Sequence, residues 1–299
     1  MEPQELKYWI ALHSVEGIGA ATYQKLLDKF GSPKEVFTAK KQDIASIPRL
    51  SEAKAAEILS VNEKWNEIEK LMLRLDDIGV DTATIADDEY PSLLRQVKNP
   101  PPIIYMYGRI QKEDEKSIAI VGSRNATEKG LQIARGFGKR LAERGYTVVS
   151  GYAKGIDTES HLGALEGNSR TIMVISNGIF HFKLRDAGFE SFEFLKQNGA
   201  IISESFPTES WTVGAAMARN RLVVGLSKAV LVVECGLKSG TMNTANVARN
   251  MNRPLFVLQY QQVGENVLGN EQLLKSGTIA VQRFSDVRLI EKYIVDQLK

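Results

Sequence analysis

From about residue 117 onward, short apolar runs alternate with longer segments of helical spacing, and this alternation most constrains the fold. The runs are rich in β-branched residues, which is typical of strands buried on both faces of a parallel sheet. Such alternation implies right-handed crossovers and a Rossmann-like, doubly wound, mainly parallel α/β sheet, with ligands at the carboxyl ends of the strands. We expect strands at Ser117–Val121, Thr147–Ser150, Thr171–Ile175, Ala200–Ser203, Ala229–Glu234, Pro254–Gln259 and Ile279–Gln282, and helices near 127–144, 157–166, 191–197, 213–226 and 241–250.

The first 60 residues or so contain two related helix-turn-helix units. In the first, a glycine turn at Val15–Gly19 separates two segments of helical spacing. The second repeats this plan around Ile47–Leu50 without the glycines, and Ser51 is the expected N-cap of its second helix. The backbone of such a turn can bind a DNA phosphate, but the same units also suit a packing or protein-contact module, so both interpretations stay open.

The chain therefore divides into three parts. We expect a small all-helical domain at residues 1–65, of the tandem helix-hairpin-helix kind. A connecting segment with an edge strand follows at residues 66–108, where prolines at 100–102 predict a stiff extended approach to the apolar segment Ile103–Gly108. The Rossmann-like domain then occupies residues 109–299.

Net charge does not explain how an anionic ligand would be bound. Lys and Arg together number 38 and Asp and Glu 36, so any anion must be bound by locally placed groups.

The one cysteine, Cys235, excludes an internal disulfide and a cysteine zinc site and fits a reducing compartment. The histidines lack metal-binding spacing and no Walker motif occurs, so we expect neither metal nor cofactor. Without a basic leader or a run of 18 apolar residues, the chain is expected to be cytoplasmic and not bound to membranes.

Four motifs fall where the fold places a ligand site. Glycines permit close backbone approach, helix N-termini offer unpaired N–H groups, and Ser, Arg and Lys add donors and charge. Each motif alone is also typical of an ordinary strand-to-helix connection, but together they predict a phosphate-binding edge. They are Gly122-Ser123-Arg124, Gly151-Tyr152-Ala153-Lys154-Gly155, Arg219-Asn220-Arg221 and Lys238-Ser239-Gly240-Thr241.

The order of these motifs resembles the DprA (Smf) family of DNA-processing proteins. The resemblance covers about residues 87–277 and also rests on Asp88-x-Tyr90-Pro91, Ser203-Glu204-x-x-Pro207 and Thr244-Ala245. It implies an extended Rossmann domain that binds single-stranded DNA in a basic pocket, forms a homodimer and helps load the RecA recombinase during natural transformation. It also implies that the helical domain is sterile-alpha-motif-like and that the four motifs contact DNA phosphates.

The chain departs from the family pattern at two places. It has Val257-Leu258-Gln259-Tyr260 where the family usually has a Val-Pro-Gly turn, and Met217-Ala218 precedes Arg219 where a Phe is common. These departures leave open a paralogue with a role in plasmid handling or phage defence.

The alternative from another functional class is a LOG-type nucleotide phosphoribohydrolase on the same kind of sheet. Its signature ends in a Glu that would stabilise charge developing on the ribose, and that position is Thr244 here. Asp157 and Glu204 are candidates for an acid/base pair, but we expect Asp157 to cap its helix or brace the Gly155 turn and Glu204 to order its loop. We therefore expect a binding protein, and a nucleotide sensor on the same fold also stays open.

Two helices contain residues whose role we expect to be packing. Gly136 and Gly138 lie in mid-helix and predict close contact between helices.

Arg219 and Arg221 lie two positions apart, roughly 200° around a helix, so they cannot both face one phosphate. We expect one of these arginines to be structural, paired with Glu204 or Glu234.

Overall fold

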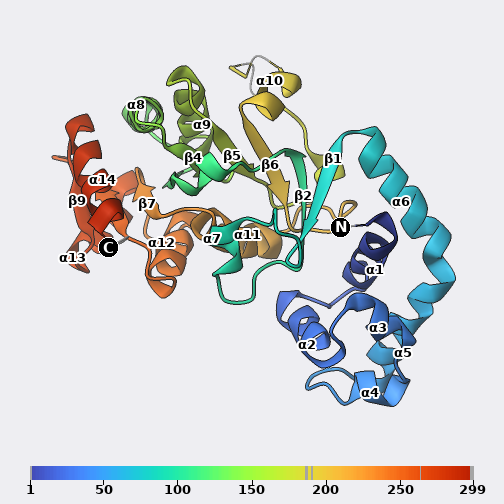
Figure 1. Ribbon diagram of the computed structural model, residues 1–299. Helices are drawn as coiled ribbons and strands as arrows, with labels where there is room; N and C mark the ends of the chain where they lie inside the picture. The colour runs from blue at the N-terminus through green and yellow to red at the C-terminus, as the bar shows by residue number, and fades with distance from the viewer. Residues whose placement is uncertain (1, 186–187, 190, 263, 297–299) are drawn as a thin grey trace. The chain divides into compact units, whose positions relative to one another are not determined.

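The computed structural model describes residues 2–185, 188–189, 191–262 and 264–296. The chain forms two compact units, drawn in Figure 1. Unit 1 comprises Met1–Tyr90 and Lys98–Met106, and unit 2 comprises Pro91–Val97 and Tyr107–Lys299. The domain limits expected from the sequence, at residues 65 and 108, stay a prediction.

Unit 1 is helical apart from two strands. Its elements are α1 (Pro3–His13), α2 (Ala20–Phe30), α3 (Pro33–Thr38), α4 (Lys41–Ala45), α5 (Glu52–Ser60), α6 (Trp65–Asp77), β1 (Val80–Thr84) and most of β2 (Ile103–Gly108). The strand β1, which the sequence did not predict, lies beside β2 at the edge of the sheet, so Ile103–Gly108 is not the edge strand that was expected.

Each of the two turns of unit 1 contains a residue in the left-handed backbone conformation, although one turn lacks glycine. Gly17, in the turn between α1 and α2, has a φ of 77°, and Arg49, between α4 and α5, has a φ of 78°. Ser51 accepts a hydrogen bond from the Lys54 N–H at 3.1 Å, which confirms the expected N-cap. The side chain of Lys54 also donates to the Glu16 carbonyl at 2.8 Å and so links the two turns.

Unit 2 is built on a parallel sheet, as the alternation of runs predicts. Its strands lie in the order β6, β5, β4, β3, β7, β8, β9, and each adjacent pair is parallel. Residues along β3 are fully buried, as expected for a strand covered on both faces. The bounds are β3 (Ser117–Val121), β4 (Thr147–Ser150), β5 (Thr171–Val174), β6 (Gly199–Ser203), β7 (Ala229–Val232), β8 (Leu255–Leu258) and β9 (Ile279–Val281).

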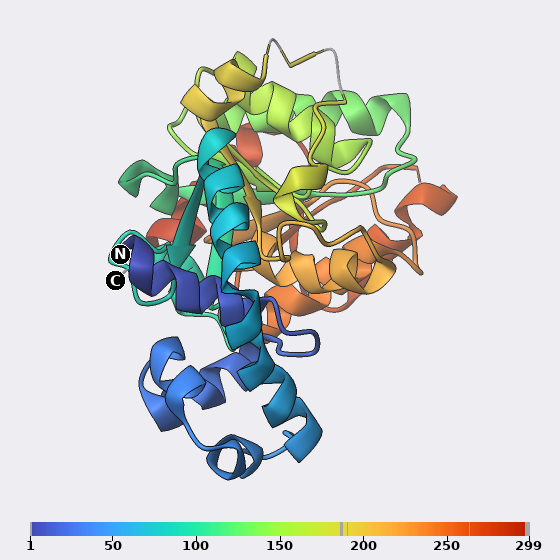
Figure 2. The ribbon, with the colours of Figure 1, turned by 90° about the vertical axis from the view of Figure 1, so that its right-hand side faces the viewer.

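Helices cover both faces of this sheet, which confirms the doubly wound fold. Figures 1 and 2 show α8 (Glu128–Ala142) and α9 (Ile156–Glu166) on one face and α11 (Val213–Gly225) and α12 (Gly240–Asn250) on the other. The remaining helices of unit 2 are α7 (Ser92–Arg95), α10 (Phe192–Gln197), α13 (Leu268–Lys275) and α14 (Val287–Asp296). Three of the covering helices have an N-cap residue whose side-chain hydroxyl accepts a hydrogen bond from a backbone N–H. These N-caps are Thr127, Thr212 and Ser239.

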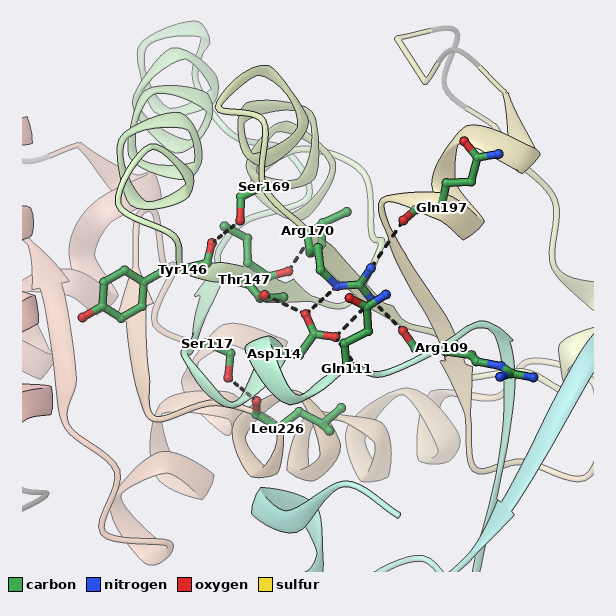
Figure 3. Close-up of polar contacts among 12 residues, drawn as sticks. Arg109, Gln111, Asp114, Ser117, Tyr146, Thr147, Ser169, Arg170, Gln197 and Leu226 are labelled. Atoms are coloured by element: carbon green, nitrogen blue, oxygen red, sulfur yellow. Dashed lines mark hydrogen bonds and ion pairs between the residues drawn. The ribbon is translucent and has the colours of Figure 1, made fainter. Parts of the chain in front are cut away.

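A buried ion pair joins segments at the amino ends of the central strands (Figure 3). Asp114 accepts hydrogen bonds from Arg170 Nε at 2.9 Å, just before β5, and from Thr147 Oγ1 at 2.7 Å, at the start of β4. Arg170 Nη2 also donates to the Arg109 carbonyl. The Asp114 side chain is 1% exposed, so these partners compensate the cost of burying its charge. The network fixes the edge of the sheet opposite to the expected ligand site.

Close packing of α8 on α9 depends on glycine. A Cβ added at Gly138 would lie 2.4 Å from the Ser160 carbonyl oxygen, and one added at Gly163 would lie 2.1 Å from that of Arg135. A Cβ at Gly136 would instead meet the Phe284 ring at 2.5 Å. The expectation of close helix packing is confirmed for Gly138, whereas Gly136 leaves room for the Phe284 ring.

We expect Gly138→Ala to lower the free energy of unfolding by about 1–3 kcal/mol, because the helices must separate to admit a methyl group. Gly214→Ala in α11 is the control, since its new Cβ would have only Thr212 Oγ1 within 4 Å, at 3.8 Å. This control is expected to be neutral or to raise the free energy of unfolding by about 0.5–1 kcal/mol. Denaturant titrations measure both, and equal effects of the two substitutions would contradict this account of the packing.

Candidate nucleic-acid interface

Successive strands β4, β5 and β6 are added on one side of β3, and β7, β8 and β9 on the other side. A crevice forms at this switch point between the parallel strands β3 and β7, at the carboxyl edge of the sheet. Ile118 of β3 pairs in register with Ala229 of β7. Turns that follow β3, β4 and β7 meet α11 around a cavity of about 360 Å³, which we call the first cavity. Of the predicted site residues, those that line it are Gly122, Ser123, Arg124, Gly151, Ala153, Arg219, Asn220, Ser239, Gly240 and Thr241.

The four remaining predicted residues lie elsewhere. Lys154 lines a neighbouring cavity of about 680 Å³, which we call the second cavity. Gly155 has a φ of 82° and lies so close to the Ser123 carbonyl that a Cβ would be 2.5 Å from it, so it shapes the turn. Lys238 is exposed and lines neither cavity.

Arg221, the fourth, forms an ion pair with Glu204. Because Glu204 lies at the end of β6, this pair fixes the strand end to α11. The expectation that one arginine of the Arg-Asn-Arg motif pairs with Glu204 is therefore confirmed.

Arg219 projects from α11 beneath the first cavity. It is 6% exposed, and its Nη1 donates to the Val174 carbonyl at the end of β5 at 2.9 Å. Burial lowers the pKa of its guanidinium, whereas the charge of Asp157 raises it. A Cβ at position 151 would lie 1.5 Å from Arg219 Nη1, so Gly151 is needed for this side chain to fit.

Asp157 lies in the first turn of α9 and lines the first cavity. Burial raises the pKa of its carboxyl group, and the Arg219 charge and the Ala153 N–H act in the opposite direction. The Ala153 N–H donates to Asp157 Oδ2 at 3.4 Å, so the carboxylate braces the turn after β4, as expected. Its placement suits a structural counter-charge for Arg219.

The turns after β3 and β7 are bound to each other. The Ser123 N–H donates to the Glu234 carbonyl at 2.8 Å, and the Glu234 carboxylate accepts from the Thr127 N–H at 2.9 Å and from its hydroxyl. The N-terminus of α8 is thus occupied by a buried side chain, and Glu234 is not a partner for either arginine of α11. The start of α12 is different, because a Cβ at Gly240 would meet nothing within 4 Å and so leaves room for a ligand.

Three side chains at this edge lie outside the sequence motifs and were not predicted. Trp211, just before α11, lines both cavities and is 51% exposed. Lys183 and Arg185, in the segment that follows β5, line the second cavity. An isolated tryptophan in the polar run 208–212 was a usable signal for Trp211, whereas no motif marks the two cations.

The two departures from the family pattern have different positions. Met217 lines the first cavity and is 40% exposed. Gln259 and Tyr260 lie at a separate cavity of about 290 Å³ beyond β8, where burial and the nearby Glu234 raise the pKa of the Tyr260 hydroxyl. The changed turn after β8 therefore does not line the first or second cavity.

Family models match both units. The model for DNA recombination-mediator protein A matches residues 81–291, and the model for a SAM-like helix-hairpin-helix tandem matches residues 10–61. The chain belongs to the DNA recombination-mediator protein A family. The second match confirms the tandem helix-hairpin-helix and SAM-like character expected for the N-terminal domain.

Relatives and solved structures agree with this assignment. The chain is 30% identical over 282 residues to protein Smf of Synechocystis sp., covering 93% of this chain and 70% of that protein. The X-ray structure of DNA processing protein A (DprA) from Streptococcus pneumoniae matches with a TM-score of 0.77 at 25% identity, covering 95% of this chain and 97% of the other. A Helicobacter pylori DprA structure, described for its single-stranded DNA binding mode, matches with a TM-score of 0.60 at 29% identity, covering 73% and 95%.

The described residues provide neither a cluster of metal ligands nor a helix that could span a membrane. Across these residues, no three His, Cys, Asp or Glu side chains are grouped so that they could hold a metal ion. None of the described helices has the length and hydropathy that a membrane span requires.

We expect the free energy of unfolding to depend on pH because of Glu204. Burial raises the pKa of its carboxyl group from 4.5 to about 7, although the Arg221 charge opposes the shift. The folded state thus retains a proton that the unfolded state has lost, so the contribution of Glu204 to stability is complete below pH 4.5 and disappears as pH rises through 7. Between pH 5 and 8 the free energy of unfolding should fall, by on the order of 1–3 kcal/mol from this group.

Urea titrations of the wild type and Glu204→Gln across this range measure the effect. The difference between the two proteins isolates Glu204, because burial lowers the pKa of His13 to about 4 and of His161 to about 3, and both histidines contribute the opposite slope below pH 6.5. Parallel curves for the two proteins would show that Glu204 does not titrate in this range.

Proposed function

We propose that this chain binds single-stranded DNA at the carboxyl edge of the unit 2 sheet, protects it and helps load the RecA recombinase during natural transformation. In this proposal the protein acts in the cytoplasm as a homodimer and catalyses no reaction. Membership of the DNA recombination-mediator family supports the role, and the Helicobacter pylori relative is described as binding single-stranded DNA.

The observation that carries the proposal is the charge of the two adjoining cavities. Arg124 lines both of them, and Lys154 lines the second. Among the described lining residues the carboxylate is Asp157, which faces Arg219. Arg124 and Lys154 are exposed and have no carboxylate partner among the residues described, so their charges are available to an anion.

The shape of the site favours a flexible strand. Its walls are short turns and helix starts that surround hollows of about 360 and 680 Å³. A strand whose phosphates can rotate independently can enter such hollows, whereas the phosphates of B-form DNA are fixed along a stiff rod.

Thr244 supports a binding role over hydrolysis. It lines the first cavity where a nucleotide phosphoribohydrolase would have its Glu, and its hydroxyl donates to the Gly240 carbonyl at 3.2 Å. A hydroxyl engaged in this way does not supply the negative charge that an oxocarbenium-like transition state requires.

Single-stranded oligonucleotides should bind more tightly than duplexes of equal length, with little dependence on sequence. Competition gel shifts with labelled oligo(dT) measure this preference, using unlabelled mixed-sequence single strand, duplex and dTMP as competitors. A duplex that competes as well as the single strand would contradict the proposed site.

Arg124 and Arg221 provide a matched pair of substitutions. Arg124→Ala should flatten the slope of log affinity against log salt by about 0.7, the contribution of one phosphate contact on a single strand, and should leave the melting temperature nearly unchanged. Arg221→Ala should lower the melting temperature, because it removes the ion pair that joins the end of β6 to α11, and should leave the salt slope unchanged. Fluorescence anisotropy at several salt concentrations and thermal unfolding measure both quantities. If neither substitution alters the slope, the DNA site lies elsewhere.

A further inference from the structure

Trp211 stands on the wall that the first and second cavities share. Its neighbours on that wall, which also line both cavities, are Arg124, Asn125, Gly151, Ala153 and Arg219. Half of its surface is open to solvent, at 51%, and the apolar side chains of Val213 and Met217 beside the first cavity are also exposed, at 67% and 40%. Large apolar side chains exposed beside cationic hollows suit stacking on a nucleobase.

The second cavity has its own set of cations. Lys154, Lys183 and Arg185 line it together with Arg124 and Arg219, and its described lining residues include no Asp or Glu. This hollow has the charge of a phosphate site and nearly twice the volume of the first cavity, at about 680 against 360 Å³.

The segment that carries these extra cations is fixed to the turn after β4. The Arg185 N–H donates to the Tyr152 hydroxyl at 2.8 Å, and Arg185 Nη2 donates to the Tyr152 carbonyl at 3.3 Å. The Arg185 guanidinium also lies 5.2 Å from the centre of the Tyr152 ring. Tyr152 is 4% exposed and contacts Phe182 and Phe189, so the wall of the second cavity is packed in place.

We infer that one single strand occupies both cavities of a protomer, with a base stacked on Trp211 where it passes from the first to the second. The second cavity then binds the next phosphates through Lys154, Lys183 and Arg185. This inference rests on the proposed function and extends it, because the first cavity alone would account for DNA binding. It assigns a role to three residues outside the sequence motifs.

Trp211 also provides the optical signal that tests the inference. The chain has three tryptophans, and the other two lie in unit 1, where Trp9 is 6% exposed and Trp65 is half-buried. Oligo(dT) should quench the fluorescence of the wild type and of Trp65→Phe, but not that of Trp211→Phe. Trp211→Ala should weaken binding about tenfold, whereas Trp211→Phe should retain most of the affinity, because a phenyl ring still stacks. Val295→Ala, at an exposed residue of α14 that is 50% open to solvent, is the control and should bind as the wild type does.

Oligonucleotide length tests the second cavity. Affinity for the wild type should rise from a dinucleotide to an octamer of dT, and Lys183→Ala should reduce this rise and flatten the salt slope by about 0.7 for the octamer alone. Three results would overturn the inference. The octamer could bind Trp211→Ala as tightly as the wild type, or quenching could persist in Trp211→Phe. The third is complete displacement of the octamer by dTMP at the concentration that just saturates the binding site for dTMP. In each of these the octamer still binds, so the proposed function survives. Absence of any single-strand binding by the wild type would overturn both.

Discussion

A single buried guanidinium determines the shape of the candidate site. Arg219 extends from α11 on one face of the unit 2 sheet and contacts the last carbonyl of β5. The charge of Asp157 on α9, which covers the other face, opposes the effect of burial on the Arg219 guanidinium. Because Gly151 has no side chain, the Arg219 guanidinium fits against the turn after β4 and reaches the Val174 carbonyl. Packing alone therefore requires this glycine, whether or not a ligand binds.

Burial then separates the cations of this edge into two classes. Arg219 and Arg221 face Asp157 and Glu204, and they hold α11 to the strand ends. Arg124 and Lys154 remain exposed in the turns that this framework supports. A chain with a net charge of only +2 can therefore present a concentrated positive site, because the acidic residues near the site act as counter-charges for Arg219 and Arg221.

The sequence predicted what depends on local periodicity. Apolar runs located the strands of unit 2, and the two-residue spacing of Arg219 and Arg221 already required the two side chains to diverge. The positions of Lys183, Arg185 and Trp211 depend instead on how the segments after β5 and β6 fold back over the strand ends, and no spacing rule describes that path. Arg49 is a similar case, because its left-handed backbone conformation replaces a glycine that the pattern of the first turn would require.

The two walls of the crevice, at the ends of β3 and β7, lie far apart in the sequence. Ile118 is in register with Ala229, so more than a hundred residues separate the two walls of the crevice along the chain. Contacts between such distant segments form late, because closing a long loop costs entropy before any contact repays it. During synthesis, the turn after β3 emerges early and lacks its opposite wall until β7 and the start of α12 have followed. The crevice of the nascent chain is therefore incomplete until β7 and the start of α12 have been synthesised, and the proposed site for a single strand can form only then.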